Sequence, residues 1–235
     1  MKKLITLALS FSLVSPSLVT YAEDNTPAVS PMVSGYVSCT DGDIELVSPN
    51  KTPKIYVDEI NDYPGVVRAA NDLKDDITAV TGVVPELTSD ANSADIIIGT
   101  IDKSDKITEL ADSGSIDISK ISSEWEAFTL NEADGKLVIA GADKRGTIYG
   151  IYDLSESMGV SPWTWWADVV PSHSDYLYVS LPEEGYTEGA SSVKYRGIFI
   201  NQEWNLFNWS KSLSSDGIGM SSETYEKIFE LLLRL

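Results

Sequence analysis

The residues with the clearest chemical potential lie where an apolar segment ends in the C-terminal part of the chain. Residues 194–200 (KYRGIFI) run directly into Asn201, Gln202 and Glu203. In a (β/α)8 barrel the carboxyl end of each strand faces the active site, so polar side chains there contact substrate. Asn201 and Glu203 are therefore candidates for substrate binding, and Glu203 is a weak candidate for catalysis. Arg196 is interpreted as structural, and the sequence assigns no catalytic acid or base.

A cluster of tryptophans in the preceding part of the chain points to carbohydrate. Trp163, Trp165 and Trp166 stand within four residues and are followed by Asp168. An indole face stacks on the C–H groups of a sugar ring, and a carboxylate beside it accepts hydrogen bonds from hydroxyls. Trp165 and Asp168 are thus candidate substrate contacts. The alternative, which composition leaves equally open, is that the tryptophans pack between two domains and that Asp168 caps a turn.

A basic helix start supplies a third candidate. Lys144 and Arg145 follow a predicted strand and open a predicted helix. Free backbone N–H groups at such a position favour an anion, so Arg145 is a candidate for binding an acidic substrate, although a solvated helix start is the more common case. The chain contains no Walker or GxGxxG pattern, so a nucleotide ligand is not expected.

Composition excludes several classes of function. The formal net charge of −19 argues against nucleic acid and against an anionic membrane surface. A single cysteine, Cys39, forms no disulfide within the chain and no cysteine zinc site. His173 is the only histidine, so the chain has too few histidines for a multi-histidine metal site and only one that a catalytic triad could use. The sequence predicts neither a metal nor a cofactor.

The elements that would position these residues alternate between strands and helices. Asp134-Gly135 favours a tight hairpin turn, because both of its positions adopt positive φ. Gly82 and Gly159 follow the ends of two amphipathic helices. The alternation predicts an α/β domain. Strands are predicted at 54–58, 94–101, 125–131, 136–142, 176–181 and 194–200, and helices at 66–80, at 145–158 and from about 223 onward, the last capped by Ser222.

The chain divides into four predicted segments. Residues 1–22 resemble a secretory signal peptide cleaved after Ala22, which predicts export. Residues 23–48 are predicted to be a linker, and residues 49–190 an N-terminal, sandwich-like α/β domain. Residues 191–235 are expected to form the first strand and helix of a truncated (β/α)8 barrel, since one strand and one helix do not bury their apolar faces alone. No later segment is apolar enough to span a membrane.

Several long runs resemble glycoside hydrolase family 115. Residues 143–156 (DKRGTIYGIYDLSE) and 159–169 (GVSPWTWWADV) resemble its N-terminal domain. Residues 193–201 (VKYRGIFIN) resemble the opening of its catalytic barrel, and residues 225–235 (YEKIFELLLRL) the first barrel helix. The resemblance covers the chain from about residue 50 to its end. One departure stands at Gln202-Glu203, where the family pattern has an Asp-Glu pair; an amide does not act as a base.

The resemblance implies an inverting xylan α-1,2-glucuronidase that removes glucuronic acid or its 4-O-methyl form. Such an enzyme uses two carboxyl groups about 6.5–9.5 Å apart, and most of the barrel that would hold them is absent, so the 235 residues are expected to be inactive alone. The implied partner is glucuronoxylan or its oligosaccharides, and a homodimer of the complete enzyme stays open. The alternative function is a non-catalytic polysaccharide-binding α/β module.

Overall fold

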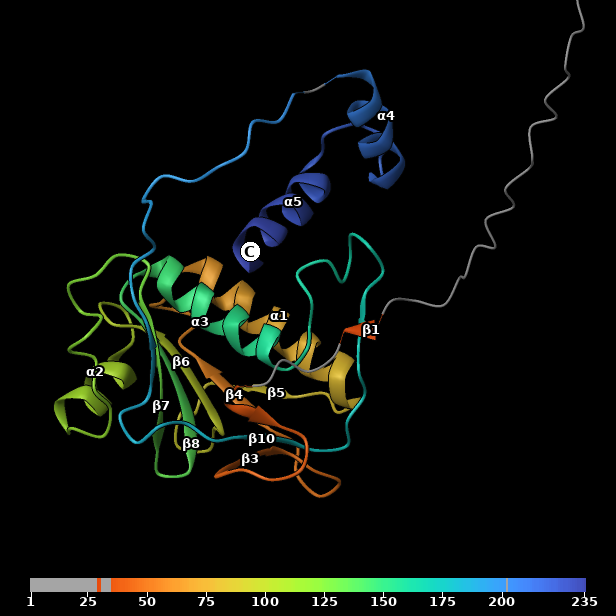
Figure 1. Ribbon diagram of the computed structural model, residues 1–235. Helices are drawn as coiled ribbons and strands as arrows, with labels where there is room; N and C mark the ends of the chain where they lie inside the picture. The colour runs from red at the N-terminus through yellow and green to blue at the C-terminus, as the bar shows by residue number, and fades with distance from the viewer. Residues whose placement is uncertain (1–28, 31–34, 202) are drawn as a thin grey trace, which may run out of the picture.

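A mixed six-stranded sheet forms the centre of the fold (Figure 1). The computed structural model describes residues 29–30, 35–201 and 203–235. In spatial order the strands are β11 (Tyr186–Glu188), β7 (Phe128–Ala133), β8 (Lys136–Gly141), β6 (Ile96–Thr100), β4 (Lys54–Val57) and β5 (Glu86–Thr88). The pairs from β8 to β5 are parallel, and β7 pairs antiparallel with both β8 and β11.

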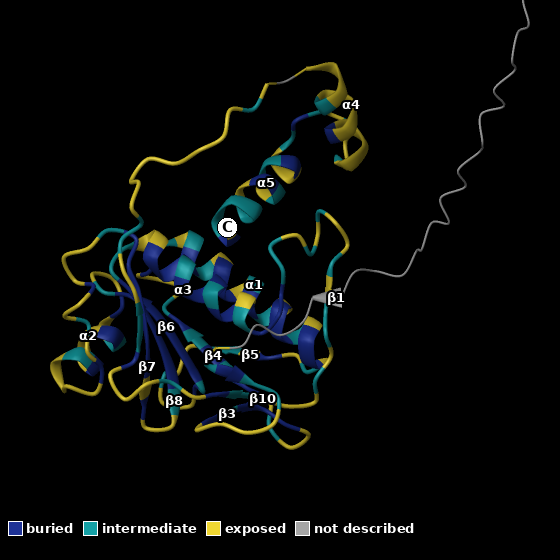
Figure 2. Cartoon of the chain, in the orientation of Figure 1, coloured by how far each residue is buried: buried dark blue, intermediate teal, exposed yellow. Residues whose placement is uncertain are grey.

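Helices cover both faces of this sheet. α1 (Pro64–Thr81) and α3 (Lys144–Ser157) lie side by side on one face, and α2 (Asp105–Asp112) lies on the other. Successive side chains of β6 point to opposite faces, so Ile96 and Ile98 join the core under α1 and α3 while Ile97 joins the core under α2. Figure 2 shows buried residues concentrated on the central strands and on the inner sides of α1 and α3.

The predicted α/β class and its main elements are confirmed. β4, β6, α1 and α3 form at the predicted places. The β7–β8 hairpin turns at Asp134 and Gly135, whose φ angles are 53° and 75°. Gly82 and Gly159 follow the ends of α1 and α3 with φ of 73° and 89°, the left-handed conformation that stops a helix at low cost. α2, β5 and β11 were not predicted.

The linker prediction is wrong for residues 37–47. β2 (Val37–Ser38) and β3 (Ile44–Val47) flank β10 (Leu177–Val179) in a small antiparallel sheet. Val37, Ile44, Leu46 and Val47 are buried in the main core. Their partner strand is about 140 residues away in the sequence, so no local pattern marks the pairing. A further short pair joins β1 (Val29–Ser30) to β9 (Val170–Pro171), and residues 1–22, the predicted signal peptide, lie outside the described residues.

The C-terminal part differs from the predicted strand and helix. Residues 194–200 form no strand, and Tyr195, Ile198 and Phe199 are 87%, 58% and 90% exposed. The reason is that no strand of the described chain lies beside this segment to pair with it. Two helices follow, α4 (Trp204–Leu213), which was not predicted, and α5 (Ser222–Arg234). Ser221, not Ser222, is the N-cap of α5, without a side-chain hydrogen bond.

A buried ion pair attaches α5 to the α/β domain. The Arg234 guanidinium donates from Nη1 to Asp76 Oδ2 at 2.8 Å and from Nη2 to Oδ1 at 3.2 Å. The same guanidinium lies 4.4 Å from the Tyr152 ring centre, and Tyr152 donates to Asp72 at 2.6 Å. Burial raises the pKa of the Asp76 carboxyl, and the Arg234 charge opposes that rise. Within the described residues, no helix is long and apolar enough to cross a bilayer.

Replacing Asp76 with alanine should release α5 from α1. The change leaves the buried Arg234 guanidinium with Glu230, whose Oε1 accepts from its Nε at 3.1 Å, but without the partner of Nη1 and Nη2, and we expect a cost of about 3 kcal/mol. We expect faster hydrogen exchange of α5 amides and a lower urea midpoint. The exposed neighbour provides a matched control: Asp75→Ala should change stability by less than about 0.5 kcal/mol. Unchanged α5 exchange in Asp76→Ala would show that the other contacts of α5, among them the Trp166 hydrogen bond and the Arg68–Glu226 ion pair, hold the helix without Asp76.

Candidate functional site

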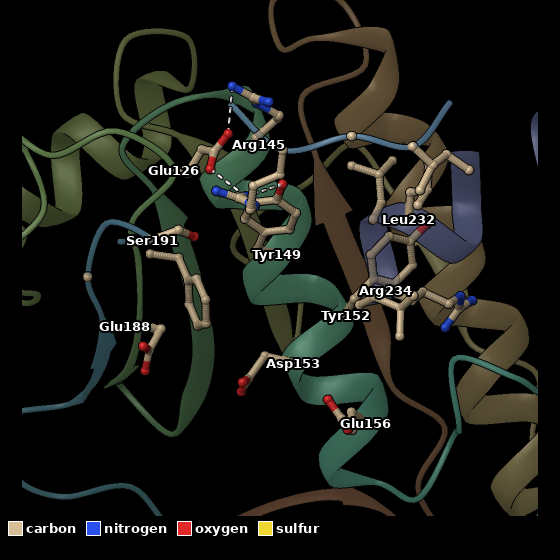
Figure 3. A pocket seen from close by; sticks show the side chains of 17 residues that line it. Glu126, Arg145, Tyr149, Tyr152, Asp153, Glu156, Glu188, Ser191, Leu232 and Arg234 are labelled. Carbon is tan, nitrogen blue, oxygen red and sulfur yellow. Dashed lines mark hydrogen bonds and ion pairs between the residues drawn. The ribbon is translucent and has the colours of Figure 1, made fainter. Parts of the chain in front are cut away.

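An open groove of about 540 Å³ lies between α3, residues 188–198 and the end of α5 (Figure 3). One end carries Arg145, Arg196 and Tyr149, here called the cationic end. The other carries Asp153, Glu156 and Glu188, here called the acidic end. Figure 3 shows Arg145, Tyr149, Asp153 and Glu156 following one another along α3, with Glu126 beside Arg145 at the cationic end. The groove thus separates opposite charges along its length.

The cationic end is built around Glu126, whose side chain has 0% exposure. Arg145 Nη2 lies 2.6 Å from Glu126 Oε1, and Arg196 Nη2 donates to Oε2 at 2.7 Å. Oε1 receives no hydrogen bond in the described part of the chain, so its contact with Arg145 is an ion pair without hydrogen-bond alignment. Arg196 also donates to Tyr149 Oη at 3.2 Å and to the Val193 carbonyl at 2.6 Å.

The backbone at Glu126 is held in an unfavourable conformation. Its φ is 58°, a region that non-glycine residues seldom occupy. The Glu126 N–H donates to Asp143 Oδ2 at 3.0 Å, and Asp143 Oδ1 accepts from the N–H groups of Arg145 and Gly146, each at 2.9 Å. A Cβ at Gly146 would lie 2.1 Å from the Ala127 carbonyl oxygen, so only glycine fits there. Asp143 therefore joins the start of α3 to the turn before β7.

This capping corrects the prediction of an anion at the start of α3. The N–H groups of Arg145 and Gly146 already bind the Asp143 carboxylate, as N-cap residues do. Only the Arg145 side chain, which lines the groove, is left to meet an acidic ligand.

The acidic end includes a carboxyl group enclosed by tyrosines. Tyr36 donates to Asp153 Oδ2 at 2.5 Å. Burial raises the pKa of the Asp153 carboxyl, and the Tyr36 hydrogen bond opposes this. Burial, followed by the Asp153 charge, raises the pKa of Tyr186 to about 12. These phenols stay protonated at neutral pH and remain available as donors to the carboxylate.

A second depression contains two of the predicted substrate contacts. Trp165 and Asp168 line it together with Thr164, Asp75 and Lys227. Trp165 is 40% exposed, and Lys227 Nζ lies 5.8 Å from its ring centre. Asp168 has a φ of 51°. This depression, here called the tryptophan depression, offers an aromatic face next to charged hydrogen-bonding groups.

The neighbouring Trp166 packs between two parts of the protein, which is the alternative that the sequence left open for the tryptophans. Its ring stacks on Trp209 of α4, with centres 5.4 Å apart. Its Nε1 donates to the Lys227 carbonyl of α5 at 3.3 Å. Trp166 therefore packs the domain against the C-terminal helices, while Trp165 keeps an exposed face.

Asn201 and Glu203 lie apart from both sites. Asn201 Nδ2 donates to Glu203 Oε1 at 2.7 Å, and Glu203 is the exposed N-cap of α4. Neither residue lines the groove or the tryptophan depression, and Gln202 lies outside the described residues. The structure therefore distributes the five predicted contacts over three places. No group of three or more metal-binding side chains occurs in the described ranges.

Sequence reasoning missed the partners of Arg145. The sequence places Glu126 in the predicted strand 125–131 and interprets Arg196 as structural; the ion pair with Glu126 fits that interpretation, although the Arg196 side chain is 40% exposed. A signal existed at Glu126, a carboxylate directly before the apolar start of a hairpin strand. Its two arginines come from positions 145 and 196, a separation that no local pattern reveals.

Comparisons with known proteins match two parts of the chain. Residues 48–154 match the model described as glycosyl hydrolase family 67 N-terminus, and residues 188–235 match glycosyl hydrolase family 115. The chain is similar to a solved structure described as a novel family GH115 4-O-methyl-alpha-glucuronidase with specificity for decorated arabinogalactans. The two are 37% identical over 81% of this chain and 24% of that chain, with a TM-score of 0.68.

A more distant likeness is to Streptomyces plicatus N-acetyl-beta-hexosaminidase, at 13% identity and a TM-score of 0.39, covering 66% of this chain and 25% of that one. No curated protein matches. The present chain spans about a quarter of the length of the solved structures that it matches.

Replacing Glu126 with glutamine should destabilise the groove. The two guanidinium groups would then lose the charge that both contact; because they are 46% and 40% exposed, solvent screens part of their repulsion, and the expected cost is about 1–2 kcal/mol. We expect a lower free energy of unfolding in urea and easier proteolysis at residues 191–198. Glu124→Gln, an exposed carboxylate two residues earlier, is the matched control. Equal stability of the two variants would mean that Glu126 carries no net charge-pairing role.

Proposed function

This chain is a relative of glycosyl hydrolase family 115, and from that relationship we propose that it is part of a glycoside hydrolase that removes glucuronic acid side chains from polysaccharides. The observation that carries the proposal is the 37% identity over 81% of the chain with a 4-O-methyl-alpha-glucuronidase structure. The match to the family 115 model at residues 188–235 supports it independently of the N-terminal domain.

The proposed bond is the α-1,2 linkage of glucuronic acid, or its 4-O-methyl form, to xylan, cleaved with inversion. Inversion requires an acid and a base about 6.5–9.5 Å apart with a water between base and sugar. The related structure is described as specific for decorated arabinogalactans, so that polymer is the competing substrate. We further propose that residues 1–22 direct export of the protein out of the cytoplasm. Both polymers would be encountered there.

The 235 residues alone should release no glucuronic acid. The described residues form an α/β domain and two further helices, without a closed barrel to hold an acid and a base together. The assay compares this chain with the complete product of its gene on an aldouronic acid, on glucuronoxylan and on decorated arabinogalactan. The complete protein should release glucuronic acid, initially as the β-anomer by proton NMR. Release of the α-anomer would contradict inversion, and no release from any substrate would contradict the glucuronidase.

Glu203 is a candidate for a catalytic or substrate-contacting carboxyl, in addition to Asp168, the candidate substrate contact in the tryptophan depression. In the complete protein, Glu203→Gln should lower kcat/KM on an aldouronic acid by about 10²-fold or more, because the change removes a charge at nearly constant volume. Glu184→Gln, which alters an exposed loop carboxylate, should leave kcat/KM within about twofold. A similarly small effect of Glu203→Gln would place Glu203 outside the site.

A non-catalytic polysaccharide-binding module is the second candidate function. It is favoured by Trp163 and Trp165, which are 47% and 40% exposed. Two results together would favour this function over the enzyme. Gels containing glucuronoxylan would retard the 235-residue chain but not its Trp165→Ala variant, and the complete protein would hydrolyse no substrate.

A further inference from the structure

The cationic end of the groove has the features of a site for an acidic sugar. We infer that Arg145, Arg196 and Tyr149 bind the carboxylate of a uronic acid residue on a polysaccharide, at a subsite separate from Glu203. The recognition of a carboxylate rests on the geometry of the groove. The choice of a uronic acid as its bearer rests on the proposed function.

The guanidinium groups are the exposed charges at this end. Arg145 and Arg196 share the carboxylate of Glu126, at 2.6 and 2.7 Å, while the Asp143 carboxylate nearby is bound by backbone N–H groups. The Arg145 and Arg196 side chains are 46% and 40% exposed, whereas the Glu126 side chain has 0% exposure. In a chain of net charge −19, these exposed guanidinium groups give an anionic ligand a place to bind.

Stability alone is a poor explanation for this arrangement. Burying the Glu126 charge carries a desolvation cost, and its φ of 58° adds backbone strain. Strained residues with buried charge recur where a protein orients groups for a ligand. Here the buried carboxylate orients two guanidinium groups that come from distant parts of the chain.

Hydrogen-bonding groups remain for a ligand. Arg145 contacts Glu126 Oε1 through Nη2 as an ion pair without a hydrogen bond, so the N–H groups of its guanidinium remain available as donors to a ligand carboxylate. Tyr149 Oη accepts from Arg196, so its own O–H proton can be donated into the groove. These donors suit a single carboxylate next to a sugar ring.

The acidic end restricts the class of ligand. Asp153, Glu156 and Glu188 repel a second anionic group, which disfavours polyphosphates and nucleic acid. The same carboxylates accept hydrogen bonds from hydroxyls. A ligand with one carboxylate and several hydroxyls matches both ends, and a uronic acid with the sugars attached to it has that composition.

Binding is tested by proton–nitrogen NMR titration of the 235-residue chain at constant ionic strength. The probes are xylotriose bearing 4-O-methylglucuronic acid, unsubstituted xylotriose, and free glucuronate beside glucose. We expect saturable shifts with the two acidic probes, in the millimolar range or tighter, at the amides of Arg145, Tyr149 and Ser191. The neutral probes should not shift these amides.

Two variants with equal charge change make the test specific. Arg145→Gln should weaken binding of the acidic oligosaccharide by about tenfold or more, since it removes a charge-assisted hydrogen-bond donor. Lys144→Gln should alter it by less than about twofold, because Lys144 does not line the groove and its Nζ lies 5.8 Å from the Tyr63 ring centre. If Arg145→Gln does not fold, the wild-type chain provides the test: the acidic probes should shift the amides of Arg145, Tyr149 and Ser191, and the neutral probes should not.

Three results would overturn the inference. They are shifts confined to Trp165 and Asp168, equal binding of neutral and acidic probes, and no saturable shift with the acidic probes at tens of millimolar. Loss of the proposed function is a separate outcome. If the complete protein releases no glucuronic acid but free glucuronate still binds at Arg145, the subsite stands without the glucuronidase.

Discussion

A carboxylate with no exposed surface, that of Glu126, joins three parts of the chain. It pairs with Arg145 at the start of α3 and with Arg196 in the segment that leaves the sheet. Its backbone N–H binds Asp143, which in turn caps α3. The shape of the groove follows from this arrangement, because both of its long walls are attached to the same buried group.

A second buried charge pair, Asp76 with Arg234, attaches the C-terminal helix to the same domain. Ion pairs of this kind contribute little net stability, because desolvation offsets attraction, but they penalise any arrangement that leaves one partner alone. The two pairs therefore act on geometry more than on stability. Together with the contacts of Trp166 to α4 and α5, they attach residues 191–235 to the α/β domain.

A strongly acidic protein that acts on an acidic substrate has an electrostatic difficulty. With a net charge of −19, long-range attraction of a uronic acid is unfavourable at low salt. Recognition then depends on short-range donors arranged against the overall field. The cationic end of the groove has this form, since its guanidinium groups are exposed there and are already oriented by Glu126.

The sequence by itself determined the elements whose causes are local. The Asp134-Gly135 turn, the stop of α1 at Gly82 and the doubly buried β6 follow from residue types within a few positions, because backbone sterics and side-chain period act at that range. These elements establish the α/β class. Among the site residues, Arg145, Trp165 and Asp168 were found because arginine, tryptophan and aspartate carry chemistry that can be recognised without knowing their neighbours.

Only the tertiary structure decided which residues meet. β2 and β3 pair with β10 far along the chain, and residues 194–200 remain unpaired despite a strand-like pattern, because a strand depends on a neighbour that pattern does not supply. In the same way, the partners of Glu126 come from positions 145 and 196, and Trp166 is covered by α4 and α5. Charge pairing and burial are properties of contacts between distant segments, which is why residue types alone did not reveal them.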